Sequence, residues 1–206
     1  MKIETFVTGI VSTNCYLAIN ETSKQTVVID PAACPKKLLD FINDEKLVIE
    51  GIFLTHAHFD HILGLKDFLC IYPVPVYINE KGGDILKDPH QNLSMVYTDG
   101  FSFEGADYLK DGDVIEIAGF NFKAIWTPGH TPDGTCYYEE NEKVLFSGDT
   151  LFEESVGRTD FANSDTKALE DSIKEKLFIL PNDVKVFPGH MGATTIGHEK
   201  EYNPYV

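Results

Sequence analysis

The segment Thr55–His61 reads THAHFDH and places three histidines and one aspartate within seven residues. It follows directly on the apolar run Ile52–Leu54, which we interpret as a short buried strand. Loops at strand ends are held by a rigid sheet and are the usual location of active sites. Our starting hypothesis is that this segment binds metal and that the fold is built to present it.

The spacing inside the segment has a physical reason. Residues two apart in an extended chain point the same way, so His56 and His58 can hold one ion together. Asp60 continues this alternation, and His61 breaks it by starting the next turn. Asp60 and His61 can then face a second ion. Imidazole and carboxylate ligands suit zinc, and also iron or manganese.

Three further apolar runs each lead through a glycine to a residue that can bind metal. Phe122–Trp126 leads to His130, Val144–Phe146 to Asp149, and Val184–Phe187 to His190. A glycine at this point lets the backbone turn sharply and direct the next side chain toward a common centre. Five of the seven histidines of the chain lie in these segments. We therefore predict that the four segments form one metal site.

Strand-like runs outnumber helical ones along the rest of the chain. Strands are expected over Ile3–Val7, Cys15–Ile19, Thr26–Ile29, Val74–Ile78, Val114–Ile117 and Cys136–Tyr138 in addition to the four runs above. Helices are expected after Pro35, over Ile62–Leu69, after Ser164 and Asp165, and over His198–Tyr202. The segment Lys81–Phe103 is expected to be an irregular loop that can cover the site. Helices between groups of strands indicate an α/β or α+β layered fold.

Composition limits the possible partners. The 206 residues suit one domain, 1–206, and carry a net charge of -16 from 33 acidic and 17 basic residues. Such a surface repels phosphate backbones and anionic lipid, so we expect neither nucleic acid nor membrane as a partner. No secretory signal is recognised, and the four cysteines form no CxxC pair, so we expect a cytoplasmic protein with buried, reduced thiols.

The motifs Thr55–His61, Thr127–His130, Ser147–Asp149 and Pro188–His190 resemble, in this order, those of the metallo-β-lactamase superfamily. The resemblance spans nearly the whole chain and implies a four-layer αββα sandwich with the site at one edge of two sheets. It also implies two divalent metal ions, with zinc preferred over iron or manganese. The first would be held by His56, His58 and His130, the second by Asp60, His61 and His190, with Asp149 bridging both. Asp30 matches an early aspartate that supports the site from outside the ligand set.

The segment Ser155–Phe161 (SVGRTDF) and the tail Gly197–Val206 resemble small bacterial glyoxalase II-like hydrolases. This resemblance implies hydrolysis of a small-molecule thioester, with S-lactoylglutathione as the reference substrate, by a hydroxide bridging the metals. Asp60 is the candidate catalytic residue that orients the hydroxide. Full glyoxalase II enzymes carry a further C-terminal helical region that binds glutathione, and the sequence ends before such a region. Two-zinc β-lactamases typically have Cys in place of Asp149, which argues against antibiotic hydrolysis.

Arg158 has two possible roles. Its planar guanidinium can bind a substrate carboxylate through two N–H groups, or it can form a structural salt bridge.

Other functions compete with thioester hydrolysis. Gly157–Phe161 also resembles persulfide dioxygenases of the same superfamily, in which one iron would be held here by His56, His130 and Asp149. A nuclease or phosphodiesterase is disfavoured by the acidic composition and the absence of a basic patch. A binding module without turnover is disfavoured because all seven ligand positions carry competent residues.

Overall fold

The computed structural model describes all residues from Met1 to Val206, and its frame is a pair of six-stranded sheets. The first sheet has the order β1 (Lys2–Thr8), β2 (Thr13–Ile19), β3 (Gln25–Ile29), β4 (Val48–Phe53), β5 (Val76–Asn79) and β6 (Asp107–Leu109). The second has the order β14 (Thr194–Thr195), β13 (Lys185–Pro188), β10 (Val144–Gly148), β9 (Thr135–Glu139), β8 (Phe120–Trp126) and β7 (Val114–Ile117). A short ribbon pairs β11 (Leu151–Phe152) with β12 (Ser155–Val156).

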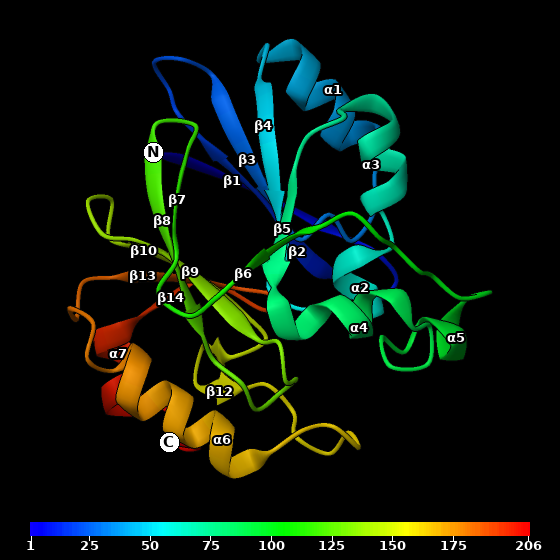
Figure 1. Cartoon of the computed structure of the whole chain (residues 1–206). Helices are drawn as coiled ribbons and strands as arrows, with labels where there is room; N and C mark the ends of the chain where they lie inside the picture. Colours follow the sequence, from blue (N-terminus) through cyan, green and yellow to red (C-terminus); the bar gives the residue numbers. More distant parts are fainter.

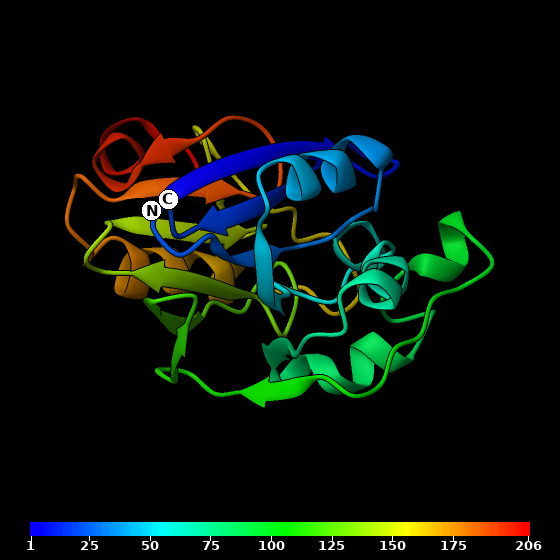
Figure 2. The same cartoon turned by 90° about the horizontal axis from the view of Figure 1, so that it is seen from above.

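Helices cover the outer faces of this sheet pair (Figures 1 and 2). Those that follow strands of the first sheet are α1 (Lys36–Asp44), α2 (Phe59–Ile62), α3 (Leu65–Ile71), η1 (Glu80–Gly82), α4 (Gly83–Lys87) and α5 (Ser94–Tyr97). Those of the second sheet are α6 (Thr166–Asp171), its π-helical continuation η2 (Ser172–Leu177) and α7 (Ile196–Tyr202). None of these helices combines the length and apolar character that crossing a bilayer requires.

The alternation of side chains in the central strands creates three apolar layers. In β2, Leu17 points to a cluster shared with α1 and α3, whereas Tyr16 points to a cluster between the two sheets. In β9, Tyr137 joins the cluster between the sheets, and Tyr138 joins a third cluster with α6, η2 and α7. Three apolar layers separate four layers of secondary structure, so the predicted αββα sandwich is confirmed.

Several local predictions need correction. The helix expected over Ile62–Leu69 is two helices, because Gly64 N donates to the Pro31 carbonyl at 3.0 Å and not to a carbonyl of the helix, at a point where a Cβ would lie 2.5 Å from the backbone of Ala33. The segment Lys81–Phe103 is partly helical, since it contains α4 and α5. The thiols are free, but only Cys15 and Cys136 are buried, and Cys70 is exposed on α3.

Candidate metal centre

The predicted ligands lie at the carboxyl ends of strands from both sheets. In the first sheet β3 and β4 run parallel, so Asp30 and the segment that begins at Thr55 leave the sheet side by side. In the second sheet β10 and β13 run parallel, and Asp149 and His190 follow their carboxyl ends. His130 follows β8, which runs in the same direction because β9 is antiparallel to both β8 and β10. The topology thus gathers residues far apart in sequence at one edge.

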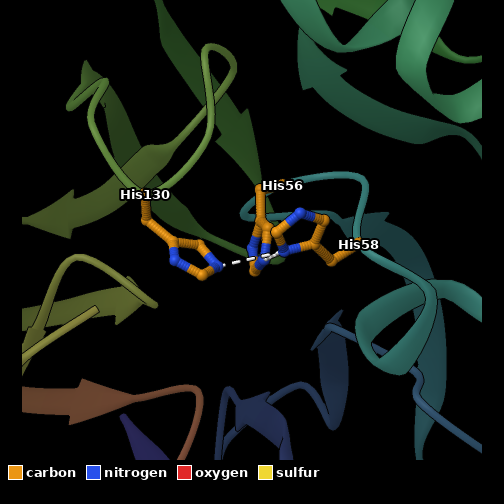
Figure 3. Close-up of side chains that lie close together, drawn as sticks. All are labelled: His56, His58 and His130. Carbon is orange, nitrogen blue, oxygen red and sulfur yellow. Dashed lines mark hydrogen bonds between the residues drawn. The ribbon is translucent and has the colours of Figure 1, made fainter. Parts of the chain in front are cut away.

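Three histidines form one end of this cluster (Figure 3). His56 Nε2 lies 3.2 Å from His58 Nδ1, and His58 Nδ1 lies 3.0 Å from His130 Nε2. All three side chains are buried. Three nitrogens at this separation match ligands around a single ion.

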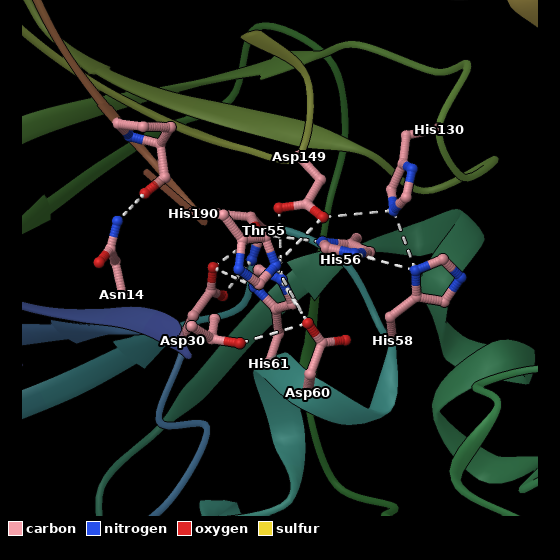
Figure 4. A network of polar contacts seen from close by, with 12 residues as sticks. Asn14, Asp30, Thr55, His56, His58, Asp60, His61, His130, Asp149 and His190 are labelled. Atoms are coloured by element: carbon pink, nitrogen blue, oxygen red, sulfur yellow. Dashed lines mark hydrogen bonds and ion pairs between the residues drawn. The ribbon is translucent and has the colours of Figure 1, made fainter. Parts of the chain in front are cut away.

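The other end is formed by Asp60, His61 and His190 (Figure 4). Asp60 Oδ2 lies 3.5 Å from His61 Nε2 and 3.2 Å from His190 Nε2. Asp149 lies between the two ends, with Oδ1 3.4 Å from His61 Nε2 and Oδ2 3.5 Å from His130 Nε2. The structure therefore brings all seven predicted ligand side chains together in one cluster.

Neighbouring acceptors select which ring nitrogen of His56, His61 and His130 faces the cluster. Thr55 Oγ1 donates to Asp30 Oδ2 at 2.7 Å, and the same carboxylate oxygen accepts from His61 Nδ1 at 2.8 Å. His56 Nδ1 then donates to Thr55 Oγ1 at 3.2 Å, and His130 Nδ1 donates to the Arg158 carbonyl at 2.7 Å. In each case Nε2 is left free to face the cluster. Asp30 thus lies outside the cluster and contacts it through Thr55 and His61.

Burial and neighbouring charges set the protonation of the cluster. Burial disfavours charged imidazole, lowering the pKa of His58 to about 3 and that of His56 well below 6.5. Burial opposes the charge of Asp149, but His61 and other histidines hold its pKa well below 3.8. Burial also opposes charge on His61, yet Asp60, Asp30 and Asp149 raise its pKa well above 6.5. The carboxylates thus create a position that favours positive charge.

The glycines before the ligands act in two ways. Gly129 and Gly148 have positive φ angles of 145° and 50°, as the turn argument requires. Gly189 has no positive φ, so that argument is wrong for it. A Cβ at Gly189 would lie 2.3 Å from Asp149 Oδ1, and the absence of a side chain is what lets the backbone approach the cluster.

Sequence reasoning missed several residues that fix the ligands. Thr13 Oγ1 donates to Asp60 Oδ2 at 3.2 Å, and Asn14 Nδ2 donates to the carbonyls of Pro188 and Met191 at 2.9 and 3.0 Å. The Asp133 carboxylate is fully buried and accepts from Ala57 N at 2.9 Å, between two of the histidines. These are polar residues at strand ends, and no local pattern distinguishes them from ordinary turn residues.

A pocket of about 360 Å³ opens onto the cluster. Arg158 lines it, and both Nε and one terminal nitrogen donate to Asp160, at 2.6 and 2.7 Å. The observed contact is therefore the salt bridge, the second of the two roles considered for Arg158. Its guanidinium also lies over the Phe161 ring, 4.5 Å from the centroid.

Comparison with known proteins identifies the family to which this chain belongs. Residues 8–190 match the Metallo-beta-lactamase superfamily, and the chain belongs to it. A hydroxyacylglutathione hydrolase, GloC of Haemophilus influenzae, is 33% identical over 210 residues, covering 100% of this chain and 98% of the relative. The predicted family is confirmed, and such relatives support a metallo-hydrolase as the enzyme class.

Solved structures agree on the fold. BLEG-1, described as a B3 metallo-beta-lactamase, has a TM-score of 0.93 and 37% identity over 99% of both chains. TTHA1623 in a di-iron-bound form has a TM-score of 0.85 and 32% identity, covering 98% of this chain and 100% of that one. ETHE1 from Myxococcus xanthus has a TM-score of 0.80 and 27% identity, covering 99% of this chain and 84% of that one.

Proposed function

We propose that this protein hydrolyses thioesters and uses two metal ions, with zinc preferred over iron or manganese. The observation that carries the proposal is the arrangement of possible ligands in three overlapping sets. The two end sets are His56, His58 and His130, and Asp60, His61 and His190, and a middle set of His56, His61 and Asp149 joins them. The middle set shares His56 with one end and His61 with the other, and its carboxylate, Asp149, lies between the two ends, so the arrangement would suit two ions.

The chemistry of the residues fits divalent ions. Nε2 of His61 and Oδ1 of Asp149 are buried and lie 3.4 Å apart, yet neither makes a hydrogen bond. Unpaired buried polar atoms are costly, and one cation between them would satisfy both. The lowered pKa values of His56, His58 and Asp149 favour neutral imidazoles and an ionised carboxylate, which are the protonation states in which these side chains bind metal. Divalent ions would lower the pKa of water and draw electron density from a carbonyl oxygen.

The remaining steps belong to the chain itself. Asp60 is held by Thr13 Oγ1 and faces His190, so we assign it to orient the attacking water and accept its proton. Thiolate is a good leaving group, so a strong acid beside the sulfur is not required. Outside the ligand set, the only polar groups that line the pocket are the Arg158 guanidinium and the Tyr97 hydroxyl, and there is no further carboxyl or imidazole group. The resemblance of the whole chain to GloC supports a thioester as the substrate.

A persulfide dioxygenase is the second candidate, favoured by the similarity to ETHE1 and by the motif Gly157–Phe161. One iron held by His56, His130 and Asp149 would serve that reaction. The similarity to BLEG-1 also weakens the argument from Asp149 against β-lactam hydrolysis, so a β-lactam belongs among the test substrates.

Metal analysis followed by a substrate panel tests the proposal. We expect about two metals per chain and turnover of S-lactoylglutathione or another lactoyl thioester. One iron per chain, with oxygen uptake on glutathione persulfide and no thioester hydrolysis, would establish the dioxygenase instead. Asp149→Ala should lose both metal content and turnover, and a variant that keeps two tightly bound metals and full turnover rules out the bridging role.

A further inference from the structure

The pocket that opens onto the metal centre has an apolar wall. Seven of its lining side chains are hydrophobic. Six of them, here named the apolar wall, are Val11, Leu93, Tyr97, Phe152, Val156 and Phe161. The apolar wall lies beside the possible ligands. The ring centroids of Phe161 and His58 are 5.1 Å apart, and those of Phe152 and His190 are 6.2 Å apart. A substrate at the metal centre must therefore lie against apolar side chains.

One residue of the apolar wall, Leu93, has an unfavourable backbone conformation. Its φ is 64°, a left-handed conformation that glycine and asparagine adopt more readily than leucine. The neighbouring Asn92 is fully buried and fixes the backbone, because its side chain donates to the Phe101 carbonyl at 2.9 Å and accepts from Ser94 N at 3.0 Å. An apolar side chain held in an unfavourable conformation at the pocket points to a contact with substrate.

The charges around the pocket disfavour an anionic substrate. Arg158 is the only cationic side chain among the lining residues, apart from the histidines of the cluster. Both oxygens of Asp160 already occupy its guanidinium. A substrate carboxylate at Arg158 would compete with Asp160 and would remain beside its charge, on a chain whose net charge is -16. Glutathione carries two carboxylates, whereas the one arginine or lysine that lines the pocket is already paired with Asp160.

From this geometry we infer that the preferred thioesters carry an uncharged, apolar thiol group, such as an arylalkyl thiol, in place of glutathione. The inference rests on the proposed thioester hydrolysis and names its substrate class. Transfer of the thiol's hydrocarbon from water to the apolar wall supplies binding energy in proportion to the area buried. The cleaved bond is the same C–S bond, with water as the second reactant and a carboxylic acid and thiol as products.

Four lactoyl thioesters test the inference on the metal-loaded enzyme. They are those of glutathione, glutathione diethyl ester, N-acetylcysteamine and phenylmethanethiol, with each kcat/KM divided by the rate of hydrolysis in hydroxide alone. We expect this normalised kcat/KM to be about tenfold higher for the thioester of glutathione diethyl ester than for that of glutathione. It should likewise be about tenfold higher for the phenylmethanethiol ester than for the N-acetylcysteamine ester. Calorimetric binding of the matching non-hydrolysable thioethers should give the same order.

Two variants locate the preference. Leu93→Asn keeps a residue that tolerates the left-handed conformation but removes the apolar side chain. It should lower kcat/KM for the phenylmethanethiol ester about tenfold relative to the N-acetylcysteamine ester. Lys46→Asn, at an exposed left-handed position with φ 55° outside the pocket, is the matched control and should not change this ratio. Asp160→Asn removes the charge that pairs with Arg158. It should raise kcat/KM for the glutathione thioester relative to that for the diethyl ester.

The outcomes separate the two proposals. If the wild-type enzyme hydrolyses the glutathione ester better than the diethyl ester and the phenylmethanethiol ester, the inference is wrong and thioester hydrolysis stands. If no thioester is hydrolysed by enzyme that holds its metals, the proposed function fails and the inference fails with it.

Discussion

Asp133 illustrates how one buried residue supports the centre without being a ligand. Its side chain has no exposed surface, and Oδ2 accepts the Ala57 N–H between His56 and His58. A Cβ at Gly82 would lie 2.6 Å from that oxygen, so η1 packs directly on the carboxyl group. Fixing the peptide between two histidines limits how far their rings can move. Asp133 is therefore a positioning residue, and its burial has a measurable consequence.

Burial raises the pKa of Asp133 from 3.8 to about 6. Between these values the unfolded chain ionises the group while the folded protein keeps it protonated, so stability falls as the pH rises from about 4 to about 6 and levels off above that. Because one pKa unit corresponds to 1.36 kcal/mol, the free energy of unfolding should be about 3 kcal/mol lower at pH 7 than below pH 4. Asp133→Asn keeps an oxygen for Ala57 N but cannot ionise, and should lack this loss.

Urea unfolding of the metal-free proteins between pH 4 and pH 7 measures the effect. The unfolding free energy of the wild type should fall relative to that of Asp133→Asn as the pH increases. A difference between the two proteins that stays constant across this range would show that the buried carboxyl has an ordinary pKa.

At the scale of elements, the first sheet holds the ligand loops of the second. Asn14 on β2 donates to the carbonyl of Pro188, the last residue of β13, and to that of Met191 in the loop after it, and Tyr16 Oη donates to the Pro188 carbonyl at 2.6 Å. From the other side, Tyr137 Oη on β9 donates to the Leu54 carbonyl at 2.8 Å, just before the histidine segment. Figure 4 shows Asn14 at the margin of this network. The ligand loops are thus fixed by contacts between the sheets.

Asn14→Ala removes two of these hydrogen bonds and should loosen His190. We expect metal affinity at the set of Asp60, His61 and His190 to fall by about 10-fold to 100-fold, as for other residues that orient ligands. Binding at the set of His56, His58 and His130 should change little. Titration of metal-free protein with zinc, followed by calorimetry, resolves the two affinities.

Asn20→Ala provides the matched control, because Asn20 Nδ2 donates to the carbonyl of Ala118 at 3.0 Å, in the turn between β7 and β8 and away from the centre. Both variants should lose about 1 kcal/mol or more of stability. Equal metal affinities in the two variants would mean that Asn14 has a purely structural role.

For the whole molecule, the centre lies where the two sheets meet. Thr55–His61 comes from the first sheet, whereas His130, Asp149 and His190 come from the second. Bound ions would link the two halves, whose other contacts are mainly the apolar cluster between the sheets. Because unfolding separates the ligands, metal binding should stabilise the fold as a whole.

We expect free zinc at a thousandfold excess over Kd to add about 4 kcal/mol to the stability. For a chain of this size the corresponding rise in Tm is roughly 10 °C. Differential scanning calorimetry with zinc and with a chelator measures the shift, and Asp149→Ala should show a much smaller one. Equal Tm values for the two preparations of wild type would contradict a centre that joins the sheets.

Short-range patterns in the sequence predicted that four segments form one metal site. The alternation in Thr55–His61 and the apolar runs that lead through a glycine to a possible ligand are local signals, and the resemblance of these motifs, in their order, to a known superfamily implied the αββα sandwich. The helix break at Gly64 was not predicted, since it results from a close approach to Ala33, 31 residues earlier.

Only the tertiary structure decided the rest. Asn14, Thr13 and Asp133 act through partners far away in the sequence, so nothing near them marks their role. The pairing of Arg158 with Asp160 also required coordinates, because a guanidinium in sequence is equally suited to a substrate or a neighbour. The segment THAHFDH marks the metal centre, but the long-range contacts set the orientation of its ligands and the character of the pocket above them.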